Sequence, residues 1–127
     1  MTILHFQDVW DRTLSNSQKE EMAQLLHALP ASGNEFDLSP IRIKYKKNGG
    51  LVATVFLRNN SHQDILLQSL QVQLLDRSKD VVADHLFDVQ LNIPASSALP
   101  WSFVFPADCV MRHKVPSEEM TVIYKIK

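Results

Sequence analysis

The first 40 residues of the chain carry apolar positions with a helical period. Four of these positions stand at i, i+3, i+4 and i+7, which is one face of a helix: Met22, Leu25, Leu26 and Leu29. Ser17 and Glu20 have the spacing of a capping box, and Pro30 is a stop signal. We therefore expect one amphipathic helix of about three turns near residues 17–29, followed by a turn-forming connector over residues 30–40.

From residue 41 onward apolar and polar residues alternate, which is the period of half-buried strands. Six runs show this alternation, and their first apolar members are Ile41, Leu51, Leu70, Val81, Leu99 and Met120. In the first run we expect Ile41, Ile43 and Tyr45 to share the interior face, and Asn48-Gly49-Gly50 then predicts a hairpin turn. Since no helical period separates the runs, the pattern predicts an antiparallel β-sandwich rather than a parallel sheet.

The length of 127 residues fits a single domain that is large enough to bury a hydrophobic core. A content of 45% hydrophobic and 21% charged residues, with a net charge of −1, excludes intrinsic disorder. The near-neutral balance also argues against a dedicated nucleic-acid-binding protein, which would carry a basic excess. Within the one domain, residues 1–40 are expected to form an N-terminal segment with the helix, and residues 41–127 the sandwich.

The N-terminus shows neither the basic region nor the continuous apolar run of a secretory signal peptide. No window approaches the roughly 20 apolar residues that span a bilayer. The single cysteine, Cys109, cannot form an internal disulfide. We therefore expect a cytoplasmic protein without a membrane span, and we interpret the glycosylation sequon Asn59-Asn60-Ser61 as a chance match.

Several segments carry a family resemblance: residues 51–59, 74–76, 81–89 and 93–106. The most specific piece is the run Pro100-Trp101-Ser102-Phe103-Val104-Phe105-Pro106. Leu4-His5-Phe6, Trp10 and Leu29-Pro30 also match, so the similarity covers nearly the whole chain. These segments resemble the SLAP domain of Gram-positive spore-forming bacteria, whose best-known carriers are S-layer assembly proteins of the accessory Sec pathway.

The resemblance implies an interaction module, because the family pattern includes no catalytic motif to carry over. A looser similarity runs to Ig-like and fibronectin-like modules of such bacteria. The expected fold is therefore a mainly β, Ig-like or fibronectin-like antiparallel β-sandwich of about six to seven strands with one N-terminal α-helix. The best-known carriers have two copies of the domain, whereas we expect this chain to be a single-domain member.

Candidate catalytic and metal-binding chemistry is sparse. The five histidines show no metal-ligand spacing, and no nucleophile elbow or phosphate-binding glycine loop occurs. Cys109 lies four residues before His113, which could form a Cys–His couple, but a small buried cysteine and a surface histidine are the favoured interpretation. His85 falls on an apolar strand face, and Asp84 and Asp88 lie roughly 13 Å apart on the polar one. We expect no enzyme, no metal and no cofactor.

The polar strand faces offer a candidate partner-binding surface. Arg42, Lys44 and Lys46 share one face of the first strand, and Lys125 lies on the last. If these strands were neighbours, the cations would form one basic patch, although such charges also serve to keep a strand solvated. Phe56 points away from the core face of its strand, where either the helix covers it or a partner does.

The pattern therefore favours a non-enzymatic protein–protein interaction domain, an adaptor or chaperone-like factor linked to protein secretion or cell-envelope assembly. The expected partner is an unidentified protein, and a homodimer through open sheet edges is a further expectation. The alternative is a β-sandwich that binds a small ligand or a metal, with His85, Cys109 and His113 as the residues involved. The stripe of Trp101, Phe103 and Phe105 is expected to fill the interior between the sheets.

Overall fold

The computed structural model describes residues 3–6, 8–29 and 33–127. Its helices are α1 (Asp8–Thr13), α2 (Asn16–Ala28) and the 3₁₀ helices η1 (Ala107–Cys109) and η2 (Ser117–Glu119). Its strands are β1 (Ile3–Leu4), β2 (Phe36–Tyr45), β3 (Leu51–Asn59), β4 (Ile65–Leu75), β5 (Val81–Ile93), β6 (Ser97–Phe105) and β7 (Thr121–Ile126).

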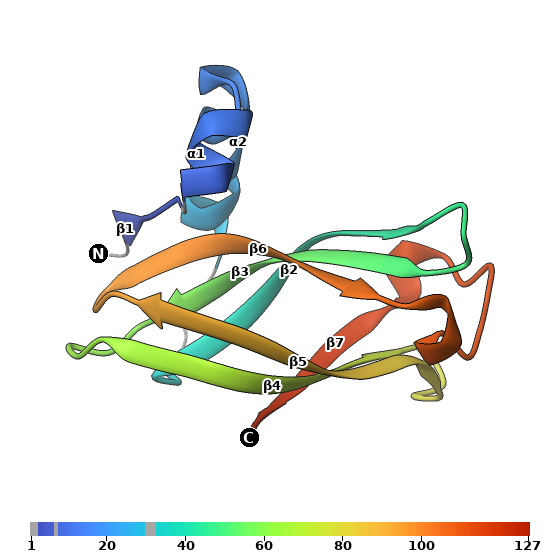
Figure 1. Cartoon of the computed structure of the whole chain (residues 1–127). Helices are drawn as coiled ribbons and strands as arrows, with labels where there is room; N and C mark the ends of the chain where they lie inside the picture. Colours follow the sequence, from blue (N-terminus) through green and yellow to red (C-terminus); the bar gives the residue numbers. More distant parts are fainter. Residues whose placement is uncertain (1–2, 7, 30–32) are drawn as a thin grey trace.

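The strands of the described residues form two sheets that pack face to face (Figure 1). Sheet A has the strand order β1-β6-β3-β2, and sheet B has the order β5-β4-β7. Every pair is antiparallel except β1 with β6, a two-residue parallel addition at one edge of sheet A. The chain crosses between the sheets after β3, after β5 and after β6, so the mainly β sandwich is confirmed.

Apolar residues of the alternating runs fill the interior between the sheets. The expected face of β3 is fully buried and consists of Leu51, Ala53, Val55 and Leu57. Phe103 and Phe105 of β6 are buried with them, and Trp101 packs half-buried against the same core. The aromatic stripe is therefore part of the core, as its period of two predicts.

Strand β2 differs from its prediction in length and in phase. It begins at Phe36, so residues 36–40, expected to be connector, form half of the strand. A register shift between Pro40 and Arg42 marks a β-bulge, in which two residues of one strand oppose one residue of its neighbour. Core contacts on both sides of the bulge come from Phe36, Leu38, Ile43 and Tyr45. Ile41 was expected on this interior face, which is wrong, because the bulge turns it to the outer face of sheet A.

Helix α2 is capped two residues upstream of the predicted capping box at Ser17, so that position was wrong. Ser15 Oγ accepts a hydrogen bond from the Gln18 backbone N–H at 3.1 Å, and the Gln18 side chain accepts one from the Ser15 N–H at 2.9 Å. The helix ends at Ala28, and Pro30, the expected stop, lies outside the described residues. The short helix α1 was not predicted, because six residues are too few to show a helical period.

Helix α2 packs on the outer face of sheet A (Figure 1). Leu26 lies there in a second apolar cluster with Phe56 and Ala98, together with the partly buried Leu4, Met22, Leu29 and Ile41. Phe56 is 1% exposed, so the helix covers it and its assignment as a partner-binding residue is wrong. The predicted helical stripe is used only in part, since Leu25 is 49% exposed.

Asn59 ties two loops to the end of β3. Its side chain is fully buried, and the amide nitrogen donates to the carbonyl oxygens of Gln63, Ile93 and Pro94 at 2.8, 2.9 and 3.1 Å. The amide oxygen accepts hydrogen bonds from the N–H and the hydroxyl of Ser61 at 2.9 and 2.7 Å. Every polar atom of the side chain is therefore satisfied, which is what a buried amide requires. The burial also removes the sequon asparagine from the surface of the folded domain.

Replacement of this asparagine tests its role. Asn59→Ala leaves buried carbonyl oxygens without a donor, and we expect it to lower the free energy of unfolding by about 3 kcal/mol. Urea denaturation followed by circular dichroism measures the loss. The exposed Asn92→Ala on β5 is the control and should change stability by less than about 0.5 kcal/mol. Equal stability of the two variants would contradict the assigned role.

Candidate functional site

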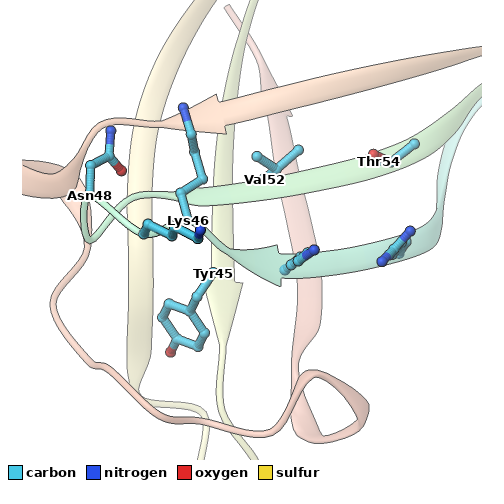
Figure 2. A pocket seen from close by; sticks show the side chains of 8 residues that line it. Tyr45, Lys46, Asn48, Val52 and Thr54 are labelled. Carbon is cyan, nitrogen blue, oxygen red and sulfur yellow. The ribbon is translucent and has the colours of Figure 1, made fainter.

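The outer face of sheet A is open between the helices and the β2–β3 turn. A hollow of about 630 Å³ lies there, which we call the basic hollow. It is lined by Arg42, Lys44, Tyr45, Lys46, Lys47, Asn48, Val52 and Thr54. Figure 2 shows Val52 and Thr54 on the strand that forms its floor, with Lys46 and Asn48 near the turn.

Two cross-strand rows form the floor of the basic hollow. The first row runs from Lys44 over Val52 to Val104, and Val104 is exposed. The second row runs from Arg42 over Thr54 to Ser102. In it the hydroxyl oxygens of Thr54 and Ser102 lie 2.9 Å apart, which is hydrogen-bonding distance. The floor therefore offers small apolar groups and hydroxyls, with the cations along the β2 side.

The β2–β3 turn holds two lysines at the rim of the hollow. The Lys46 N–H donates to the carbonyl of Gly50 at 2.8 Å, and the Gly49 N–H donates to the carbonyl of Lys46 at 3.1 Å. The Asn48 side chain accepts from the Gly50 N–H at 3.0 Å. Gly49 has a φ of +91°, in the left-handed region that favours glycine. The turn is thus closed by its own hydrogen bonds, and Lys46 and Lys47 are left exposed.

The basic hollow is electrostatically one-sided. Arg42, Lys44, Lys46 and Lys47 are all exposed, and its lining includes no acidic residue. The ion pairs found within the described part of the chain involve none of these four cations. Glu118 lines a neighbouring hollow with Arg42 and Lys44, and Glu21 another with Arg42, so the positive potential that attracts acidic ligands is strongest toward the turn, at Lys46 and Lys47. Three of the predicted partner-binding residues are therefore brought together, and Lys47 joins them.

Tyr45 fixes the strand beneath these cations. Its hydroxyl donates to the carbonyl of Arg112 at 2.9 Å and accepts from the N–H of Val115 at 3.2 Å. Figure 2 shows Tyr45 on the opposite side of β2 from Lys46. The phenol therefore clamps the loop between η1 and η2, and its hydroxyl faces that loop rather than a ligand in the hollow.

Lys125 does not belong to the basic hollow, so the expected patch across the first and last strands is wrong. Strand β7 lies in sheet B, and its outer face lines a separate hollow of about 370 Å³ with Gln71, Gln73, Ile123, Tyr124 and Lys125. Strands β2 and β7 do meet, because the Tyr124 hydroxyl donates to the carbonyl of Phe36 at 3.0 Å. This contact joins edges of opposite sheets, and the outer faces with their lysines point in opposite directions.

Cys109 lies against His85 rather than against His113. The thiol sulfur is 3.3 Å from His85 Nδ1, whereas the His113 ring lies 6.1 Å from the ring of Tyr45. Desolvation raises the pKa of the Cys109 thiol, and the negative charges of Asp108 and Asp84 raise it further. A raised pKa keeps the sulfur protonated, which is the opposite of what activates a cysteine nucleophile. The Cys–His couple within residues 109–113, which was the less favoured interpretation of the sequence, is therefore not formed, and His113 is exposed as expected.

The described residues contain no group of three or more His, Cys, Asp or Glu side chains placed to hold a metal ion. Of their helices, none combines the length and the apolar character needed to cross a membrane.

Comparison with known proteins matches the SLAP domain model to residues 4–126. The chain belongs to the SLAP domain family. No curated protein and no solved structure matches it.

Sequence reasoning missed two parts of this SLAP domain's open face. Lys47 directly follows Lys46, but the turn was interpreted only as a hairpin connection. Trp10, Leu14 and Leu25 line a smaller hollow beside the basic one, on the helix side. The signal for this hollow in the sequence was the apolar stripe of α2, which holds more apolar residues than the helix needs to pack against the sheet.

The seam beneath α2 can be tested by truncating its aromatic residue. Phe56→Ala removes the ring that Leu26 contacts, and we expect this SLAP domain to lose about 3 kcal/mol of unfolding free energy. Chemical denaturation measures the change. Leu66→Ala, at a position 64% exposed on β4, is the control and should stay within about 0.5 kcal/mol of the wild type. Wild-type stability of the Phe56 variant would show that the ring is not covered.

The environment of Cys109 predicts a pH profile. The rate of alkylation by iodoacetamide should rise with a midpoint above the ordinary thiol pKa of 9.0. Asp108→Asn removes one of the charges that raise this pKa and should shift the midpoint down, whereas Asp88→Asn on β5 should not. Since the folded state holds this proton more tightly than the unfolded chain, the thiol's contribution to stability is lost as the pH rises above 9.0. A midpoint below 9.0 would contradict the assignment.

Proposed function

We propose that this SLAP domain is a non-enzymatic protein–protein interaction domain that binds its partner on the open half of sheet A. The observation that carries the proposal is the basic hollow, in which four cations share one face without an acidic residue in its lining. We further propose that it acts as an adaptor or chaperone-like factor in protein secretion or cell-envelope assembly, which family membership supports. The proposal includes a cytoplasmic location, in keeping with a single free thiol at Cys109.

Recognition on the face is favoured over strand pairing at the free edge of β2. That edge carries Pro40, which has no N–H to donate, and a β-bulge follows directly. Proline, bulges and edge lysines are the features with which proteins keep a strand from pairing with another chain. The same features argue against a homodimer formed through this edge.

A non-enzymatic role is supported by the state of Cys109. It is the only cysteine of the chain, and burial and two carboxylates favour its protonated form. Together with His85 it supplies two ligand-type side chains, whereas structural zinc sites take four. The Cys109–His85 pair therefore does not favour the metal-binding alternative.

Charge reversal on the open face tests the proposed function. We expect the double variant Lys44→Glu, Lys46→Glu to lose at least tenfold in recovery of a stoichiometric partner by affinity capture from the encoding organism. The reason is that both ammonium groups line the basic hollow and would repel an acidic partner after reversal.

The matched control is Lys125→Glu, Lys127→Glu, which makes the same charge change on β7 and the C-terminus. It should capture the partner as the wild type does, and unchanged melting temperatures should show that both variants are folded. Equal capture by all three proteins, or equal loss in both variants, would contradict binding at the basic hollow.

A further inference from the structure

We propose that the basic hollow is one end of a longer groove that binds an extended peptide segment of the partner. This segment carries a large apolar anchor residue followed by acidic residues at alternate positions. The inference rests on the proposed function and goes beyond it by giving the chemistry of the ligand.

A second hollow of about 320 Å³ lies between the helices and the outer face of sheet A. Its lining is Trp10, Leu14, Gln18, Glu21, Met22, Leu25, Ile41, Arg42 and Thr54. Most of these side chains are apolar, and we call this space the anchor hollow. It lies beside the seam in which α2 covers Phe56, and its lining comes from α1, α2, β2, β3 and the residue Leu14 between the two helices.

The two hollows adjoin each other. Arg42 and Thr54 line both of them, and both residues belong to one cross-strand row of sheet A. On the far side of this row lies the row of Lys44 and Val52, which leads to the turn. A ligand that leaves the anchor hollow along β3 therefore enters the basic hollow.

The anchor hollow offers apolar surface that the fold itself does not cover. Leu25 is 49% exposed although it belongs to the apolar stripe of α2, and Trp10 and Leu14 are only half-buried. Exposed apolar side chains that gather at a concave site are typical of a binding surface. A large aliphatic or aromatic side chain is the occupant that fits this chemistry.

The spacing of the cations matches an extended ligand. Arg42 and Lys44 are two residues apart on one face of β2, so their Cα atoms lie about 6–7 Å apart along the strand. Lys46 follows at the same spacing in sequence. In an extended peptide lying alongside, side chains two residues apart repeat at the same distance. Acidic residues at alternate positions can therefore each meet one cation.

Charge also sets the direction of the ligand. The one acidic residue in the lining of the anchor hollow is Glu21 of α2, and it disfavours a second carboxylate there. The acidic part of the segment consequently belongs at the turn, beside Lys46 and Lys47, and the apolar anchor beside Leu25.

The test uses a fluorescein-labelled peptide of about ten residues, with one leucine followed by three glutamates at alternate positions and serines between. Fluorescence anisotropy measures its binding to the whole chain. Replacing the glutamates by glutamine should weaken binding at least tenfold, and replacing the leucine by serine about fivefold or more. Binding should also weaken as salt screens the charges.

Protein variants locate the two ends of the groove. Lys44→Glu, Lys46→Glu should weaken binding of the peptide at least tenfold, and Leu25→Gln about fivefold. The matched control for Leu25→Gln is Leu86→Gln, since Leu86 on β5 is 50% exposed and lies on sheet B. Circular dichroism of each variant checks that it is folded.

The outcomes separate the inference from the proposed function. If the partner is captured through the basic hollow but no such peptide binds, the peptide groove is wrong and the interaction domain stands. Binding that does not depend on the glutamates or on Leu25 overturns the inference, as does equal or tighter binding of a single-stranded oligonucleotide of similar charge. Binding with the expected dependences supports it even where no partner is captured.

Discussion

The packing of Phe56 against Leu26 decides which part of the molecule can meet a partner. Phe56 points out of the sandwich, and a ring of that size on a sheet surface must be covered to stay out of water. Its cover is the C-terminal end of α2, and Figure 1 shows the helix standing on the outer side of sheet A near β1 and β6. The half of the sheet toward the β2–β3 turn stays open, and the cations of β2 lie there. One apolar contact thus divides the sheet into a covered half and an open half, and the open half is the one on which we propose that a partner binds.

Much of the fold could be predicted from the sequence, because strands in a two-layer protein bury every second residue. The alternation of Leu51, Ala53, Val55 and Leu57 indicates the inner face of a sheet, where these residues are buried. Helix α2 was predictable because its apolar residues recur with the period of one helix face. What failed were features without a period: the exact cap, the short α1, the two-residue β1 and the start of β2 at Phe36. These depend on single hydrogen bonds or on pairing with strands far away in the chain.

The candidate site was predictable only within one strand. Arg42, Lys44 and Lys46 lie together because every second residue of a strand points to the same face of the sheet. This spacing can be recognised in the sequence without knowledge of the fold. Lys125 was assigned to the same patch on an assumption about strand order, and strand order depends on which sheet each strand joins. The pairing of Cys109 with His85 was missed for the same reason, since it joins η1 to β5 across the sequence.

The bulge in β2 changes which residues of the strand face the core, from even-numbered to odd-numbered ones. Ahead of it the even-numbered residues Phe36 and Leu38 pack in the core, and behind it the odd-numbered Ile43 and Tyr45 do. Loss of Ile41 would therefore leave a regular strand, in which Pro40 and Ile43 still pair on the core face and the cations still face outward, whereas loss of one residue between the bulge and the β2–β3 turn would direct the following cations into the sandwich. The extra residue at Ile41 is thus the one position of this strand where a change of length by one residue leaves the charged face intact, and elsewhere in the strand such changes are constrained by parity.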